Sequence, residues 1–241
     1  MDKKNNLENK IALLTGINGG IGQDIARQLL DENVKVIGLT SNNNNKKNVY
    51  KNLSNHKNLV DLYSCNLVNS RSVDKVCKMI IDKYGIPDFI INNAALLDLK
   101  NLENFKLDEI ISAYKVNVLS PIQICKFFIE GFKNRKSGSI INICSSSAYS
   151  GGEAAGHTVY SSTKHALLGF SRALDEEVRN FNIRVGTISP AGVATDMVKN
   201  RTDLDQNSMM STSEVADAVL YLLKAKGKGI VYEMRMWRML R

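Results

Sequence analysis

The sequence predicts an α/β domain in which a doubly wound parallel sheet of about seven strands carries helices on both faces. Short apolar runs alternate with segments of helical spacing along the chain. Such alternation is typical of βαβ units, whose right-handed crossovers cover a buried sheet on both sides. A glycine-rich turn follows the first apolar run, and no Pro-, Gly- and Ser-rich linker divides the 241 residues. We therefore expect a single domain over residues 1–241.

The expected strands are apolar runs of five to eight residues. They lie at 10–15, 34–40, 59–65, 88–92, 139–145, 183–189 and 229–236. Helical spacing marks 24–33, 73–85, about 107–134, the region from Tyr160 to about 181, and 211–224. We predict that Ser213 caps the last helix, and that its apolar face carries Ala216, Val219, Leu220 and Leu223. The asparagine run at 42–45 is interpreted as a polar loop.

Composition excludes several classes of protein. Hydrophobic residues make up 44% and charged residues 23%, as in an ordinary globular domain with a sizeable core. The net charge is +8, but the lysines are scattered without interleaved aromatic residues, so we expect a solvated basic surface and no nucleic-acid site.

The N-terminal sequence and the cysteine spacing bear on where the protein is located and on whether it binds a metal. The first ten residues hold no apolar stretch, and no run is long enough to span a membrane, so we expect no secretory signal and no membrane partner. The four cysteines form no CxxC pair, which predicts reduced thiols, no metal site and a cytoplasmic location.

The segment TGINGGIG at 15–22 lies between the first strand and the first helix. Its Gly16, Gly20 and Gly22 suit a tight turn, a close approach of backbone to a phosphate, and close packing of helix on strand. The helix then offers unpaired N–H groups to an anion. This strand–turn–helix context predicts a dinucleotide cofactor.

The end of the second strand bears on which dinucleotide binds. Enzymes of this architecture that use NAD usually place an acidic residue there to hold the adenosine ribose. This chain has Thr40, which would not repel a 2′-phosphate, and Lys46 or Lys47 would be available to bind one. The sequence therefore modestly favours NADP(H) over NAD(H).

The segment YSSTK at 160–164 opens a helical region. Residues four apart share one helix face, so Tyr160 and Lys164 are expected to point the same way. Such pairs also occur on solvated helix faces, and the interpretation depends on what accompanies the pair. Beside a nicotinamide, a phenol can donate or accept a proton, and a neighbouring ammonium stabilises the phenolate.

Five segments in order resemble the single-domain short-chain dehydrogenase/reductase family. They are TGINGGIG at 15–22, NNAA at 92–95, SIINICSSSAYSG at 139–151, YSSTK at 160–164 and SPAGVATDM at 189–197. The resemblance runs from about Lys10 to Met236 and implies a Rossmann-like fold. It also implies an NAD(P)-dependent oxidoreductase that interconverts a carbonyl and an alcohol by hydride transfer.

The resemblance implies roles for four residues. Tyr160 would be the catalytic acid–base, supported by Lys164, and Asn117 in the segment KVN would hold a water of a proton relay. Alignment on the fifth strand assigns the catalytic serine to Ser145, whereas counting back from Tyr160 leaves Ser146 and Ser147 as alternatives. The cofactor would be bound by Gly16, Asn18, Gly20, Ile21, Gly22, Thr40, Asn66, Leu67, Asn93, Ala94, Tyr160, Lys164, Pro190, Val193 and Thr195.

The sequence departs from the family pattern at three places. Ala95 replaces the glycine of NNAG, Asn66 replaces the usual aspartate after the third strand, and Ala191 separates Pro190 from Gly192. These changes put the backbone near the cofactor in question, although Asn66 can still form a hydrogen bond.

The sequence predicts only the chemical class of the substrate. The expected substrate segment at 197–210 is short and polar, and the opposite segment at 147–157 is rich in glycine, which favours a small or polar carbonyl compound over a sterol. A 3-oxoacyl thioester reductase also fits the resemblance. The alternative is a non-catalytic NADP-binding sensor or scaffold on the same fold. An epimerase or dehydratase of the extended family would be expected to carry a larger C-terminal domain.

The C-terminal segment MRMWRMLR at 234–241 is basic and amphipathic. It would pack on the core of its own subunit or contact a second copy, since Trp and Met are favoured at interfaces. The family resemblance implies a homotetramer or homodimer.

Overall fold

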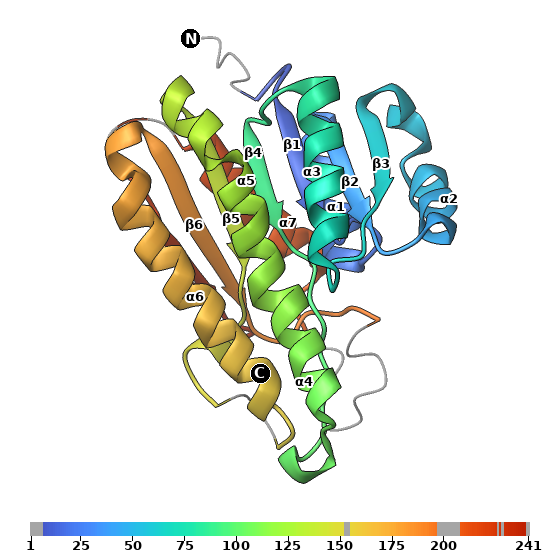
Figure 1. Ribbon diagram of the computed structural model, residues 1–241, viewed down its shortest axis with the longest axis vertical. Coiled ribbons are helices and arrows are strands. Elements are labelled where there is room, and N and C mark those ends of the chain that lie inside the picture. Colours follow the sequence, from blue (N-terminus) through green and yellow to red (C-terminus); the bar gives the residue numbers. More distant parts are fainter. Residues whose placement is uncertain (1–6, 152–154, 197–207, 226, 228, 240–241) are drawn as a thin grey trace.

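The computed structural model of the protein describes residues 7–151, 155–196, 208–225, 227 and 229–239 (Figure 1). Within these residues, parallel strands form one seven-stranded sheet in the order β3-β2-β1-β4-β5-β6-β7. The strands are β1 (Ile11–Thr15), β2 (Lys35–Thr40), β3 (Val60–Ser64), β4 (Phe89–Asn92), β5 (Gly138–Ile143), β6 (Ile183–Pro190) and β7 (Glu233–Met236). The predicted fold class is confirmed.

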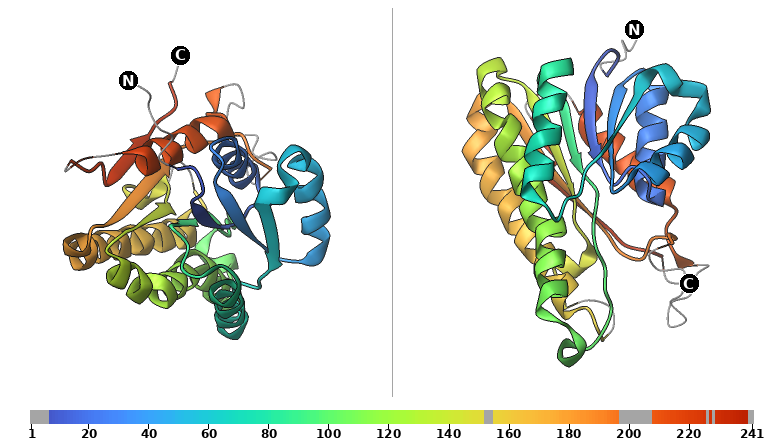
Figure 2. Two further views of the ribbon diagram at one scale, coloured as in Figure 1. Left: turned by 90° about the horizontal axis from the view of Figure 1, so that it is seen from above. Right: turned by 45° about the vertical axis from the view of Figure 1, so that its right-hand side comes forward.

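Helices cover both faces of the sheet. The α-helices are α1 (Gly20–Asp31), α2 (Asn43–Asn52), α3 (Ser70–Tyr84), α4 (Leu107–Tyr114), α5 (Ser120–Arg135), α6 (Thr158–Val178) and α7 (Thr212–Lys224). Shorter helical turns are η1 (Ser54–Leu59), η2 (Leu102–Asn104), η3 (Lys115–Leu119), η4 (Ser146–Ala148) and η5 (Arg179–Phe181). Helices α3, α5 and α6 lie in front of the sheet in Figure 1, and α1 and α7 lie behind it (Figures 1 and 2).

Alternate residues of each strand face opposite sides of the sheet, and two hydrophobic cores result. In β1, Leu14 belongs to the core beneath α1 and α7, whereas its neighbour Leu13 belongs to the core beneath α3, α5 and α6. Both side chains are fully buried. Strands buried on both faces read as continuous apolar runs, which is why the sequence located them well.

The asparagine run at 42–45 was wrongly predicted to be a loop, because it opens helix α2. Asn42 is the N-cap, and its side chain accepts a hydrogen bond of 3.0 Å from the Asn45 N–H. Asparagine is among the best N-cap residues. The rest of the helix is held by one buried side chain, Val49, and by Tyr50, which packs against the core.

The predicted cap of α7 is also wrong by two positions. Ser211 is the N-cap, and it forms a capping box in which its side chain accepts from the Glu214 N–H while Glu214 accepts from the Ser211 N–H. Ser213 lies inside the first turn. The apolar face agrees with the prediction at Ala216, Val219 and Leu223, and Leu220 is partly buried.

Two further elements differ in detail from the prediction. The helical region expected at 107–134 is interrupted by η3, a π-helical turn between α4 and α5. Strand β7 begins at Glu233, four residues later than expected. Met234 and Met236 pack against the core, whereas Trp237 and Met239 are 55% and 79% exposed.

Candidate active site

A cavity of about 610 Å³ lies at the carboxyl ends of the strands. Open parallel sheets bind ligands at this edge, where the strand order reverses on the two sides of β1. The residues predicted to bind the cofactor all line this cavity: Gly16, Asn18, Gly20, Ile21, Gly22, Thr40, Asn66, Leu67, Asn93, Ala94, Tyr160, Lys164, Pro190, Val193 and Thr195. Ser145, Ser146 and Ser147 line it too, but Asn117 does not.

The glycine turn is built so that no side chain fits at two of its positions. Gly16 has φ +67°, and a Cβ there would lie 2.8 Å from the Ala94 Cα. A Cβ on Gly22 would lie 2.2 Å from the Gly16 carbonyl oxygen. Helix α1 starts within this segment, at Gly20, without a side-chain cap and without an acidic residue in its first turn. Its first N–H groups are thus left for an anion, as a dinucleotide phosphate requires.

Thr15 joins the glycine turn to β4, and the sequence reasoning did not single it out. Its hydroxyl accepts the N–H groups of Asn93 and Ala94, each at 3.0 Å. The Asn93 side chain in turn donates to the carbonyl oxygens of Thr15 and Gly16 at 3.1 and 3.2 Å. These four hydrogen bonds fix the turn against the neighbouring strand. The only sequence signal was a hydroxyl residue directly before the first glycine.

The end of β2 presents neutral polar groups to the cavity. Thr40 and Ser41 line it, and the Thr40 hydroxyl donates to the Asn42 carbonyl oxygen at 2.9 Å. Asn66 and Leu67, which follow β3, line the cavity as well, and none of these four lining residues carries a carboxylate. Lys46 and Lys47, the lysines suggested by the sequence, lie in the first half of α2 and are not among the residues that line the cavity.

Helix α6 carries Tyr160 and Lys164 to the cavity from one face. Lys164 is 2% exposed, and its ammonium donates to the Ile143 carbonyl oxygen at 2.8 Å. It lies 5.6 Å from the centre of the half-buried Tyr160 ring. Within the described part of the chain no carboxylate pairs with Lys164, so a buried positive charge with spare N–H donors faces the cavity.

The three candidate serines form one turn after β5. The Ser145 hydroxyl accepts the Ser147 N–H at 3.1 Å and caps η4, which leaves its own proton to donate. The Ser147 carbonyl oxygen accepts the Ser161 hydroxyl of α6 at 2.8 Å. All three serines are buried to a similar degree and line the cavity, so Ser145, Ser146 and Ser147 stay alternatives on position alone.

Asn117 lies behind the cavity wall, in the π-helical turn. Its side-chain oxygen accepts the Leu96 N–H at 2.7 Å, and its nitrogen donates to the Leu96 carbonyl oxygen at 2.9 Å and to the Thr163 hydroxyl at 3.0 Å. Thr163 then donates to the Tyr160 carbonyl oxygen at 2.7 Å. Asn117 therefore connects to Tyr160 through one hydroxyl.

Other lining residues had no predicted role. Cys144 and His157 are both buried and border the serines and Tyr160. Burial raises the pKa of the Cys144 thiol to about 11, while the charge of Lys164 acts in the opposite direction. The residues at which the sequence departs from the family pattern, Asn66, Ala95 and Ala191, all line the cavity.

The substrate side is only partly visible. Of the expected substrate segment 197–210, residues 197–207 lie outside the described residues, as do residues 152–154 of the opposite segment. Met210 is bonded to the segment after β6 by two main-chain hydrogen bonds. Its N–H donates to the Gly192 carbonyl oxygen at 3.1 Å, and its carbonyl oxygen accepts the Ala194 N–H at 2.9 Å.

The family profile described as short chain dehydrogenase matches residues 10–206. The chain belongs to the short-chain dehydrogenase family. Among curated relatives of this short-chain dehydrogenase, the 3-oxoacyl-[acyl-carrier-protein] reductase FabG of Vibrio cholerae is 29% identical and covers 95% of each chain. Carbonyl reductase family member 4 of Xenopus laevis is 28% identical, over 90% of this chain and 92% of the relative.

Solved structures of another dehydrogenase and of a reductase have the same fold. An alcohol dehydrogenase of Thermococcus sibiricus, complexed with 5-hydroxy-NADP, matches with a TM-score of 0.84 at 24% identity, over 96% of this chain and 97% of the other. L-sorbose reductase of Gluconobacter frateurii, complexed with NADPH and L-sorbose, matches with 0.84 at 21% identity, over 95% of each.

Family membership makes this short-chain dehydrogenase an NAD(P)-dependent oxidoreductase acting on CH–OH and C=O groups. In the described part of the chain, no helix is long and apolar enough to cross a membrane. Nor do three or more His, Cys, Asp or Glu residues gather there in a way that would hold a metal ion.

Proposed function

We propose that this chain reduces a small carbonyl compound to an alcohol, or catalyses the reverse reaction, with Tyr160 as acid–base. The observation that carries the proposal is that Tyr160 and Lys164 line the same cavity as the glycine turn. The glycine turn, the end of β2 and the residues after β6 would hold a dinucleotide. Its nicotinamide would supply or accept the hydride. In reduction, the Tyr160 hydroxyl donates its proton to the substrate oxygen.

The other three residues assist that proton transfer. The Ser145 hydroxyl donates a hydrogen bond to the substrate oxygen as negative charge develops on that oxygen. The Lys164 ammonium stabilises the phenolate left on Tyr160, and its spare N–H groups are available to the cofactor. Asn117 would hold a water that returns the proton. Because both of its side-chain N–H groups are already used, that water has the side-chain oxygen's second lone pair or the backbone of η3 as its partner.

Tyr160→Phe tests the proposal directly. Removing one hydroxyl should lower kcat by about a thousandfold or more, since positioned acid–base groups contribute about 10²–10⁴-fold. The dissociation constant of NADPH should stay within about twofold, because the ring remains. The assay is NADPH oxidation with a panel of small diketones and acetoacetyl thioesters. A variant that keeps its full kcat would remove Tyr160 from the mechanism.

The same panel distinguishes the substrate classes and the alternative function. Several curated relatives are named as 3-oxoacyl-[acyl-carrier-protein] reductases, which supports an acyl thioester as substrate, while one is named carbonyl reductase family member 4. Tight NADPH binding without turnover of any panel member would favour a non-catalytic sensor or scaffold.

We further propose that NADP(H) is preferred over NAD(H). The support is the absence of a carboxylate among the residues that line the cavity at the end of β2, where Thr40 and Ser41 lie. Comparing the dissociation constants of NADPH and NADH by fluorescence titration tests this preference. Equal constants, or tighter NADH, would contradict it.

Two further parts of the proposal concern assembly and location. A homotetramer or homodimer is supported by exposed apolar side chains on α7 and around β7, among them Tyr221, Tyr232 and Trp237. Deleting 237–241 should change the sedimentation coefficient, and an unchanged value would remove this segment from assembly. A cytoplasmic location is supported by four cysteines that are all free and buried.

A further inference from the structure

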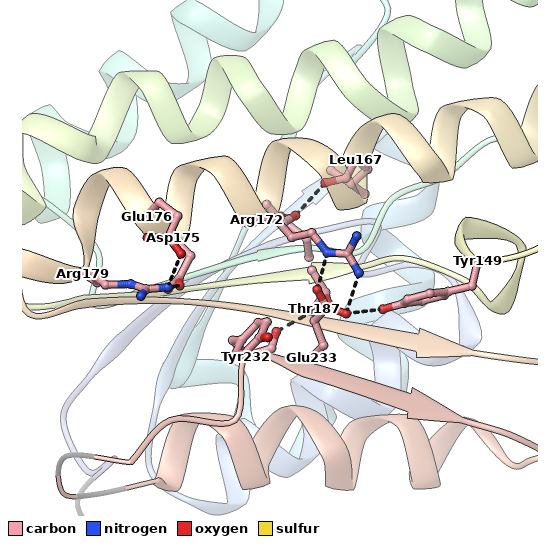
Figure 3. Close-up of polar contacts among 11 residues, drawn as sticks. Tyr149, Leu167, Arg172, Asp175, Glu176, Arg179, Thr187, Tyr232 and Glu233 are labelled. Atoms are coloured by element: carbon pink, nitrogen blue, oxygen red, sulfur yellow. Dashed lines mark hydrogen bonds and ion pairs between the residues drawn. The ribbon is translucent and has the colours of Figure 1, made fainter.

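A polar cluster joins three segments of the chain on the side of α6 that faces β7 (Figure 3). It consists of Tyr149, Arg172 and Glu233, and we call it the Glu233 cluster. Arg172 of α6 binds the Glu233 carboxylate with both arms, Nε to Oε1 at 2.5 Å and Nη2 to Oε2 at 3.0 Å. The Tyr149 hydroxyl donates to the Glu233 Oε2 at 2.8 Å.

Several contacts hold the cluster in place, although the Arg172 side chain is 53% exposed. Glu233 is the first residue of β7, in register with Thr187 of β6, whose N–H donates to the Tyr232 carbonyl oxygen at 2.8 Å. The Glu233 side chain is 18% exposed. The Arg235 guanidinium stacks 4.0 Å from the centre of the Tyr149 ring. A two-armed arginine–carboxylate pair fixes orientation as well as distance.

Charge in the cluster favours the same arrangement. The hydrogen bond from Arg172 lowers the pKa of Glu233, so the carboxylate is ionised and accepts at neutral pH. Burial and the hydrogen bond to Glu233 raise the pKa of Tyr149, so its phenol keeps the proton that it donates.

Tyr149 ends the turn that carries the candidate catalytic serine. The Tyr149 N–H donates to Ser146 O at 3.0 Å, and the Ala148 N–H donates to Ser145 O at 2.9 Å. Ser145 and Tyr149 are thus the two ends of one compact unit around η4. Ser161 links this unit to α6 by donating to the carbonyl oxygens of Ser147 and Ser150, and Ala148 shares a buried hydrophobic cluster with Leu167 and Leu168 of the same helix. The Tyr149 hydroxyl adds a link from the far end of the unit to β7.

We propose that Glu233 is a positioning residue, which holds the Ser145 turn in register with Tyr160 and Lys164. It does so through Tyr149 on the turn and through Arg172, which lies eight residues after Lys164 on the same helix. The inference rests on the proposed function, in which Tyr160 donates the proton and Ser145 donates a hydrogen bond to the substrate oxygen. A misplacement of about 1 Å in such a pair can cost about a hundredfold in rate.

Tyr149→Phe is the sharpest test, since it removes only the hydroxyl and keeps the ring beneath Arg235. We expect kcat to fall by about tenfold or more while the dissociation constant of NADPH and the melting temperature change little. With NADPH deuterated at the transferred position, the isotope effect on kcat should rise, because the chemical step becomes slower. Amides at 145–151 should exchange with deuterium faster.

Three more variants complete the series. Glu233→Asp retracts the carboxylate and should reproduce the loss, whereas Glu233→Gln keeps an acceptor for Tyr149 and should recover part of kcat. Arg179→Gln is the matched control, because Arg179 directly follows the same helix, as the first residue of η5, and binds Asp175 and Glu176 at 2.5 and 2.8 Å without reaching the Ser145 turn (Figure 3). It should lower the melting temperature and leave both kcat and exchange at 145–151 unchanged.

The outcomes separate the two proposals. An active wild type whose Tyr149→Phe and Glu233→Asp variants keep kcat within about twofold would overturn the positioning role and leave the proposed function intact. A loss of kcat in Arg179→Gln equal to that in Tyr149→Phe would also overturn it, since any weakening of α6 would then suffice. A wild type with no turnover at all would overturn the proposed function, and the inference with it.

Discussion

The two ends of the cavity differ in whether main-chain or side-chain atoms form their walls. At the β1 end the walls are backbone: Gly16 and Gly22 approach other main-chain atoms so closely that a Cβ would lie within 3 Å of them. At the α6 end the walls are side chains, and those of Lys164 and Ser145 are each held by one main-chain group, the Ile143 carbonyl oxygen and the Ser147 N–H. Main-chain geometry at the first end suits binding, and adjustable polar groups at the second suit proton transfer.

This difference predicts that substitutions at the two ends fail in different ways. A change in the backbone end should reduce cofactor affinity and stability together, because both rest on the same close contacts. A change in the side-chain end should reduce kcat while the fold persists.

Gly22→Ala should have the largest effect. The added Cβ would meet the Gly16 carbonyl oxygen at 2.2 Å, and a main-chain atom cannot rotate away. Overpacking of this severity costs about 3 kcal/mol, which is more than a hundredfold in an equilibrium constant. Denaturant unfolding and NADPH titration should show that stability and affinity fall together.

The same substitution at Gly169 is the control for that experiment. Gly169 lies in α6, and its Cβ would meet nothing within 4 Å. Alanine there should raise stability by up to about 1 kcal/mol and leave NADPH binding unchanged. If Gly22→Ala bound NADPH as tightly as Gly169→Ala, the close contact at the glycine turn would not be needed for binding.

Lys164→Met should separate rate from stability at the other end. The ammonium is 2% exposed and bonded to one carbonyl oxygen, so its replacement by an apolar side chain of similar length relieves a desolvation cost. We expect kcat to fall by about a hundredfold while the melting temperature holds or rises.

Lys126→Met, at an exposed position of α5, should change neither quantity. A melting temperature that falls in Lys164→Met, with kcat preserved, would reverse the distinction between the two ends of the cavity.

What the sequence could predict follows the same division. Strands and tight turns depend on residues that are close together in the chain. Apolar runs therefore predicted the strands, and TGINGGIG predicted the turn that requires glycine at Gly16 and Gly22. The face shared by Tyr160 and Lys164 was equally readable, since it depends only on helix periodicity.

The Glu233 cluster could not be read in this way. Its members lie 61 and 84 residues apart in the chain, and nothing local pairs a strand residue with Arg172 or Tyr149. The cap of α7 was a nearer miss, because serines occupy positions 211 and 213 and only the glutamate three residues after Ser211 distinguishes them. At 42–45, composition suggested a loop, but Asn42 acts as a cap.

Ser41→Asp should change cofactor preference without harming the fold, a smaller effect than the two above. Ser41 is exposed and lines the cavity beside Thr40. A carboxylate there would repel a 2′-phosphate and accept hydrogen bonds from a ribose. We expect NADPH to bind about tenfold more weakly and NADH equally or more tightly, measured by titration with both cofactors. An unchanged ratio would place the adenosine ribose elsewhere.

The smallest effect is expected at Cys144, where the side-chain end meets the core. Burial raises the pKa of this thiol to about 11, well above that of an exposed cysteine, so its thiolate fraction at pH 7.5 is roughly 100-fold lower. Iodoacetamide should therefore label Cys144 slowly at pH 7.5, and the rate should rise about tenfold per pH unit up to pH 10, as followed by mass spectrometry. The same chain unfolded in guanidinium is the control and should react at the ordinary rate.

Lys164→Met sharpens this measurement, because the Lys164 charge lowers the Cys144 pKa and its removal raises it further. Labelling of Cys144 should then be slower than in the wild type at every pH. Faster labelling would mean that the substitution had loosened the packing around α6. In that case the loss of kcat in Lys164→Met would report a disturbed fold and not the missing charge, and the contrast between the two ends of the cavity would have to be tested with another residue.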